Sequence, residues 1–105
     1  MALAARRCAA CTASTPPASA EDIARWSAEL ATHWQIDRTL VRQWRFRDFA
    51  SALALANRIA DVAEAEGHHP ELTVGWGRLR VEIFTHAIGA LSESDFVLAA
   101  KIDQL

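Results

Sequence analysis

Three of the four histidines lie in two short stretches that a compact fold could bring together. His68 and His69 are followed by Pro70 and leave the end of an expected helix, whereas His86 closes an expected strand eighteen positions after His68. Imidazole exchanges protons near neutral pH, so two imidazoles in one pocket can donate one proton and accept another. The spacing therefore indicates an acid–base site that needs neither a metal nor an organic cofactor.

The two ends of this expected site differ in character. His68 follows the C-terminus of a helix, where unpaired carbonyls carry partial negative charge, and Glu64 lies one turn upstream. We therefore expect His68 to act as general acid and His86, beside apolar strand residues, to act as base. Two alternatives stay open. A histidine at a helix C-terminus is often a cap, and three histidines could bind zinc, although adjacent side chains rarely point at one ion.

Two other residues have competing interpretations. Asp95 is the third residue after Ser92 in a pattern typical of a helix capping box, so a capping role competes with a role in the pocket. Trp76 lies between Gly75 and Gly77 and could form a flat wall for a ring-shaped substrate. The remaining tryptophans are expected in the core.

Cys8 and Cys11 form a lone C-x-x-C in a segment rich in Ala, Ser, Thr and Pro. A zinc site of this kind needs a second pair of ligands, which the sequence lacks. We expect an inert pair within a disordered extension over residues 1–18, followed by a single domain over residues 19–105. No metal site is expected.

Composition limits the classes of function. The chain has 105 residues, which is enough for one modest core, and a formal net charge of −2, which leaves no basic field for DNA or RNA. No apolar run approaches the roughly 20 residues that cross a membrane. We therefore expect a cytoplasmic protein that binds neither nucleic acid nor membranes directly.

Periodicity and turn residues predict an α+β fold with the element order α-β-β-α-β-β-α. Such an order favours an antiparallel four-stranded sheet with its helices packed on one face. On the other face, Phe84 among charged residues suggests a self-association surface or a singly exposed ring. Helices are expected over 20–32, over 47–66 with Phe49 and Leu53 facing inward, and from 92 onward; a hairpin is expected within 34–46, and strands at 72–76 and 78–85.

Five sequence features are specific in combination rather than singly. They are Trp34, W-R-F-R-D-F at 44–49, E-A-E-G-H-H-P at 64–70, T-H at 85–86 and L-S-E-S-D-F at 91–96. Together they resemble the pterin-4a-carbinolamine dehydratase family, also called 4a-hydroxytetrahydrobiopterin dehydratases, over roughly residues 20–105. The resemblance implies a homodimer formed by extending the sheet, with some members pairing dimers into tetramers.

The resemblance also implies a reaction and a set of residues. Family members remove water from a 4a-hydroxytetrahydropterin to give quinonoid dihydropterin for recycling, without a metal or cofactor. His68 and His86 match the acid–base pair, and His69 matches the histidine that holds the pterin. The full set expected to contact substrate comprises His69, Glu64, Pro70, Trp76 and Asp95.

One departure from the family pattern affects Trp76 and Gly77, where relatives often have an aromatic residue followed by Asn. An amide lost near the pocket would alter contacts with the pterin. The same scaffold also has dehydratase-like members that assist RuBisCO assembly in carbon-fixing bacteria, and an animal member that serves as dimerisation cofactor of a transcription factor. The alternative function is therefore a non-catalytic assembly or binding protein, with RuBisCO as its partner.

Overall fold

The computed structural model describes residues 2–105, and its elements follow the predicted order. A short 3-10 turn, η1, precedes them at Leu3–Ala5. The helices are α1 (Ala20–Ser27), α2 (Phe49–Glu66) and α3 (Glu93–Ile102), and the strands are β1 (Gln35–Ile36), β2 (Leu40–Arg45), β3 (Glu71–Gly75) and β4 (Arg78–Ile83). The α+β fold class is confirmed.

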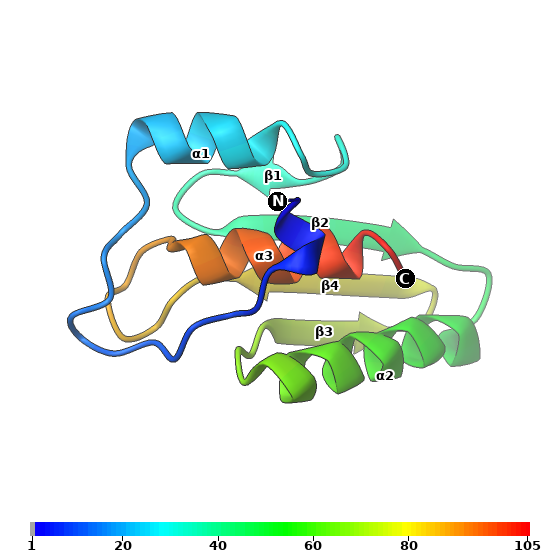
Figure 1. Ribbon diagram of the computed structural model, residues 1–105. Coiled ribbons are helices and arrows are strands. Elements are labelled where there is room, and N and C mark those ends of the chain that lie inside the picture. The colour runs from blue at the N-terminus through cyan, green and yellow to red at the C-terminus, as the bar shows by residue number, and fades with distance from the viewer. Residues whose placement is uncertain (1) are drawn as a thin grey trace.

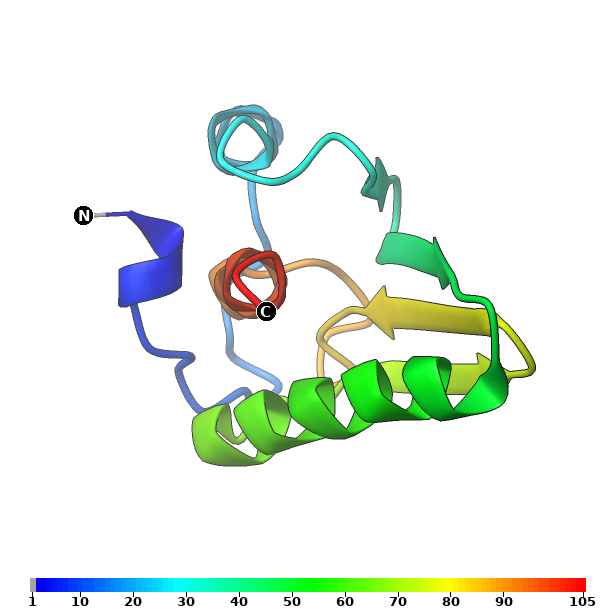
Figure 2. The same ribbon diagram turned by 90° about the vertical axis from the view of Figure 1, so that its right-hand side faces the viewer.

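The four strands form one antiparallel sheet in the order β1-β2-β4-β3. All three helices lie on one side of this sheet, and its other face is open (Figure 2). Leu79, Val81 and Ile83 of β4 point toward the helices and are fully buried, which agrees with the alternation expected of a half-buried strand.

The ends of α2 follow from two residues. Asp48 caps the first turn by accepting a hydrogen bond of 2.7 Å from the Ser51 amide, and hydrogen bonds from Ser51 lower the pKa of the Asp48 carboxyl. Gly67 ends the helix in the left-handed conformation, with φ at 65°. These caps fix where the chain leaves α2 toward the histidines.

The prediction that Phe49 and Leu53 lie on the buried face of α2 is wrong. Phe49 and Leu53 are 45% and 40% exposed, because the helix turns a narrower stripe toward the sheet. Three of the four residues on this stripe are alanines, which let the helix approach the strands closely. The stripe consists of Ala52, Ala56, Ile59 and Ala63.

Helix α1 is shorter than predicted, because its last turn tightens. The Glu29 amide bonds to the Trp26 carbonyl and the Leu30 amide to the Ser27 carbonyl, and both bonds span three residues rather than four. The chain then leaves the helix while Leu30 still reaches the core.

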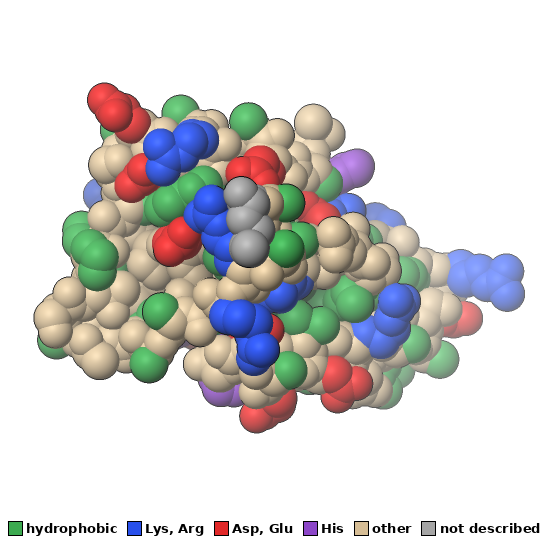
Figure 3. Space-filling view, viewed as in Figure 1, with side chains coloured by type: hydrophobic (Ala, Val, Ile, Leu, Met, Phe, Trp, Pro, Cys, Tyr) green, Lys and Arg blue, Asp and Glu red, His purple; other side chains and the backbone are tan. Residues whose placement is uncertain are grey.

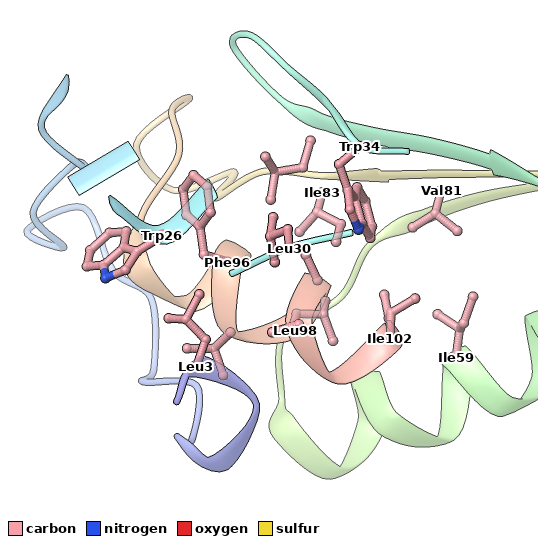
Figure 4. Close-up of a cluster of buried hydrophobic side chains, with 14 of the residues drawn as sticks. Leu3, Trp26, Leu30, Trp34, Ile59, Val81, Ile83, Phe96, Leu98 and Ile102 are labelled. Atoms are coloured by element: carbon pink, nitrogen blue, oxygen red, sulfur yellow. The ribbon is translucent and has the colours of Figure 1, made fainter. Parts of the chain in front are cut away.

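Helix α3 is the centre of the domain and is enclosed on nearly all sides (Figures 1 and 2). Its residues from Ser94 to Ala100 are all buried, as expected of a helix that packs against other elements all round. The sheet and α2 cover it from one side, and η1 covers it from the other, where Leu3 reaches toward it (Figure 4).

Asp103 fixes the C-terminal end of α3. Its carboxylate lies 2.6 Å from the Arg42 guanidinium of β2 and accepts a hydrogen bond of 2.7 Å from the Trp34 indole. The Arg42 guanidinium also lies over the ring of Trp44 at 4.4 Å. This partly buried group ties the end of the helix to the sheet.

The described residues at the start of the chain contact the domain in the structure, and replacing Leu3 tests the expectation of a disordered extension over residues 1–18. Leu3 is fully buried in the core, and the Lys101 ammonium donates a 2.8 Å hydrogen bond to the Ala4 carbonyl. Further along, the Glu66 carboxylate accepts hydrogen bonds from the Cys8 amide and the Arg7 guanidinium. The expectation rested on composition, which does not record that one leucine can fill a gap beside α3.

The surface carries both signs of charge, interspersed over the face that Figure 3 shows. This pattern agrees with the small net charge of −2. None of the helices described between residues 2 and 105 has the length and apolar composition that crossing a bilayer requires.

Replacing Leu3 tests whether the N-terminal segment is docked. We expect Leu3→Ala to lower the free energy of unfolding by about 1–3 kcal/mol, because a buried leucine is lost from a segment that can detach locally. The matched control is Leu53→Ala, on an exposed position of α2, which should change stability by less than about 0.5 kcal/mol. Equal denaturant midpoints for Leu3→Ala and the parent would mean that the segment is not docked in solution.

Candidate active site

A cavity of about 290 Å³ opens where α2, β4 and the N-terminal segment meet. Three stretches that are far apart in sequence contribute to its wall. The lining residues are Cys11, Gly67, His68, His69, Phe84, Thr85, His86 and Ala87. All three histidines singled out in the sequence therefore line one cavity.

Backbone geometry brings the two histidine stretches together. After Gly67 ends α2, Pro70 leads into β3, which pairs with β4 so that Glu71 lies opposite Glu82. Continuing this antiparallel register places the residues just before β3 beside those just after β4. The point at which α2 ends and the pairing of β3 with β4 together place the two histidine stretches around one cavity.

His68 is held by a buried carboxylate. Its Nε2 lies 2.6 Å from Oδ1 of Asp95, and the two residues are 6% and 0% exposed. The other oxygen of Asp95 accepts 2.8 Å hydrogen bonds from the Thr85 hydroxyl and the Ser92 amide. Asp95 therefore caps α3 and orients His68 at the same time, so the two roles weighed from the sequence coexist.

The hydrogen bond to Asp95 determines which ring nitrogen of His68 can act. An ionised carboxylate only accepts hydrogen bonds, so Nε2 carries a proton toward Asp95. The nitrogen left for proton exchange is Nδ1, and it lies 3.7 Å from the Cys11 sulfur.

The other two histidines are held less tightly. His86 is exposed, and its ring packs against Phe84 with centroids 4.0 Å apart. Nε2 of His69 lies 3.3 Å from Oε1 of Glu64, and both side chains are largely exposed, so this contact contributes little to stability. Both rings are therefore reachable from solvent.

The structure does not bring Trp76 to the cavity. It is 75% exposed and lies in the turn between β3 and β4, at the opposite end of the hairpin from His86. Strands of this length span roughly 15–20 Å, so a wall made by Trp76 on this cavity is excluded within one copy of the chain. Pro70 and Glu64 also lie outside the lining, and the Glu64 carboxylate lies beside His69.

Gly77 explains the departure from the family pattern. Its φ is 68°, and a Cβ there would lie 2.7 Å from the Phe46 carbonyl oxygen. Glycine therefore fits this position, whereas the Cβ of Asn would require the Phe46 backbone to move, and the position belongs to the hairpin turn and not to the cavity lining.

Sequence reasoning missed Cys11 and gave no role in the site to Phe84 and Thr85. The C-x-x-C spacing was the only signal for Cys11, and it points to metals rather than to a histidine 57 residues away. Within residues 2–105, no group of three or more His, Cys, Asp or Glu side chains is arranged to hold a metal ion.

The family described as pterin 4 alpha carbinolamine dehydratase matches residues 16–105. The chain belongs to this family. A relative from Alkaliphilus metalliredigens that carries the dehydratase name is 43% identical over 97% of this chain and 94% of its own length. The mitochondrial pterin-4-alpha-carbinolamine dehydratase 2 of Arabidopsis thaliana is 41% identical over 98% of this chain and 58% of its own length.

Two solved structures resemble the fold. A transcriptional coactivator/pterin dehydratase from Brucella melitensis superposes with a TM-score of 0.76 at 26% identity, covering 85% of this chain and 97% of that one. A pterin dehydratase-like RuBisCO assembly factor of the alpha-carboxysome has a TM-score of 0.55 at 22% identity, covering 68% of this chain and 83% of its own, and shares the fold alone.

Removing the Thr85 hydroxyl tests whether its hydrogen bond to the Asp95 carboxylate stabilises the fold. We expect Thr85→Val to lower the free energy of unfolding by about 1–3 kcal/mol, because a fully buried carboxylate loses a donor. Thr85→Ser keeps the hydroxyl and should lose less, and denaturant unfolding of the two variants gives the comparison. If valine were tolerated as well as serine, Asp95 would not depend on this hydrogen bond.

Proposed function

We propose that this chain dehydrates a 4a-hydroxytetrahydropterin to quinonoid dihydropterin, in recycling of the pterin cofactor. The observation that carries the proposal is a single cavity lined by His68, His69 and His86 in a member of the dehydratase family. A volume of about 290 Å³ lies at the lower end of small-molecule sites, which suits a bicyclic ring.

The reaction breaks the bond between C4a and the hydroxyl oxygen. His68 gives a proton from Nδ1 to the departing hydroxyl, which leaves as water, and His86 removes the proton from N5. The electron pair of the N5–H bond then forms the C4a–N5 double bond. Two imidazoles that line one cavity can supply both proton transfers, so the step requires no metal or organic cofactor.

Two other lining residues would position the ring. Phe84, which packs against His86, replaces Trp76 as the proposed flat wall. His69, with Glu64 beside it, would hydrogen-bond the polar edge of the pterin. The buried hydrogen bond from His68 to Asp95 keeps one imidazole fixed while these exposed groups adapt.

Histidine variants test the assignment. We expect His68→Ala and His86→Ala each to lower kcat for fresh 4a-hydroxytetrahydropterin by about a hundredfold or more, because each removes one proton-transfer group. His33→Ala, outside the cavity lining, should keep the parent rate, and Trp76→Ala should keep the parent KM. The measurement is the rate of dehydration above the uncatalysed rate.

Two outcomes of this assay would count against the proposal. No acceleration by the parent would favour the alternative of a non-catalytic assembly or binding protein, such as a RuBisCO assembly factor. A parent rate retained by both His68→Ala and His86→Ala would show that the imidazoles do not carry the chemistry.

We also propose that the chain forms a homodimer by pairing of edge strands, with a tetramer as a further step. Within residues 2–105 the sheet edges are β1 and β3, and β3 is the longer of the two.

Thr73→Lys on β3 should weaken the dimer, because the two copies would bring like charges together, whereas Gln43→Lys on the central strand β2 should not. Sedimentation of both variants decides this, and a monomeric parent would remove the proposal. A cytoplasmic location stays a prediction.

A further inference from the structure

The N-terminal segment brings a thiol into contact with the buried histidine. The Cys11 sulfur lies 3.7 Å from Nδ1 of His68, whose Nε2 lies 2.6 Å from Oδ1 of Asp95. Thiol, imidazole and carboxylate thus form one continuous chain of polar contacts. Cys11 is half-buried and lines the same cavity as the histidines, so its sulfur is open to a ligand there.

The order of these three groups is that of an activated nucleophile. A base beside the thiol accepts its proton, and a carboxylate on the far side of the base fixes the orientation of the ring. Because Nε2–H of His68 donates a hydrogen bond to Asp95, the neutral form of His68 carries its lone pair on Nδ1, where it faces the Cys11 thiol.

The segment that carries Cys11 is held by hydrogen bonds to the end of α2 and to the start of α3. The Glu66 carboxylate at the end of α2 binds the amide of Cys8 at 2.9 Å, and the Ser94 hydroxyl at the start of α3 accepts from the Ala9 amide at 3.0 Å. Burial alone would raise the pKa of Glu66, but the Cys8 amide, Arg7 and Lys101 together lower it, so the anchor carries a charge. These hydrogen bonds hold the segment against the domain and thereby place the Cys11 thiol at the cavity.

We propose that Cys11 is a modification site at which a low-molecular-weight disulfide reacts and closes the cavity. His68 takes the thiol proton, the Cys11 thiolate attacks one sulfur of the disulfide, and that disulfide bond breaks as the mixed disulfide forms. The departing thiolate takes the proton from His68 and leaves as a thiol. Only the consequence for catalysis rests on the proposed dehydratase function, whereas the thiol chemistry is independent of it.

Cys8 serves as an internal control, because its surroundings disfavour the thiolate form. Burial first, and the Glu66 carboxylate next, raise the pKa of its thiol to about 12. Its sulfur lies 3.4 Å from the Ser94 carbonyl oxygen, which can accept a hydrogen bond from the thiol. A thiol in this setting reacts slowly while the segment stays docked.

The first experiment measures the reaction of each thiol in the full chain. An aromatic disulfide that releases a coloured thiolate is added to the parent, and peptide mass mapping assigns the modified cysteine. We expect Cys11 to react roughly tenfold faster than Cys8 or more. Cys11→Ser should lose the fast phase and Cys8→Ala should keep it. Equal rates for the two cysteines would overturn the proposal.

The second experiment tests the coupling to His68. We expect His68→Asn to slow the reaction of Cys11 by roughly tenfold or more, because the proton acceptor is lost. His69→Asn, which changes the adjacent exposed imidazole, should leave the rate of Cys11 unchanged. The rate of Cys8 reports folding in each variant, since a loosened segment would make Cys8 faster. A Cys11 rate that is unaffected by His68→Asn overturns the coupling.

The third experiment measures dehydration after modification. In a parent with dehydratase activity, the mixed disulfide at Cys11 should abolish most of that activity, and a thiol reductant should restore it. Cys8→Ala should be inhibited like the parent, and Cys11→Ser should resist. Full activity of the modified parent would overturn closure of the cavity. A parent without any activity would contradict the proposed function, while the labelling rates still decide whether Cys11 and His68 form the site.

Discussion

A buried carboxylate must find donors for its oxygens, and Asp95 finds them in three different parts of the chain. The His68 imidazole comes from the end of α2, the Thr85 hydroxyl from the end of β4, and the Ser92 amide from the start of α3. None of these elements can shift without leaving charge unpaired in the core. The same constraint that holds the layers together also orients the imidazole at the cavity.

Helix α3 carries a second acid at its other end, where Asp103 binds Arg42 and Trp34 of the sheet layer. The helix is thus fixed at both termini by side chains and enclosed between them by apolar packing. A scaffold of this rigidity suits a small site whose outer groups, such as His86 and His69, remain adjustable. Catalysis requires the proton donor to be held in one orientation, and the buried hydrogen bond to Asp95 holds His68 in this way.

The sequence predicted those features that local pattern determines. Alternation located β4, helix caps located α2, and the position of Gly67 and Pro70 relative to the strands placed the histidines together. What it could not supply was long-range packing. Nothing local to Leu3 or Cys11 says that residues from the start of the chain lie beside α3 and His68, and nothing in the flanking glycines of Trp76 says which end of the hairpin the cavity occupies. The rotation of α2 that exposes Phe49 likewise depends on how closely its alanines let it approach the sheet.

The packing of η1 against α3 has a consequence for biosynthesis. Leu3 and Cys11 leave the ribosome before α3, which packs against η1, so the wall that Cys11 contributes cannot be completed until α3 has been made. Until then Leu3 has no hydrophobic surface to cover, and the nascent protein carries an open, unfinished cavity. The pocket therefore forms late, because its N-terminal wall waits for a helix that begins about 90 residues after Leu3.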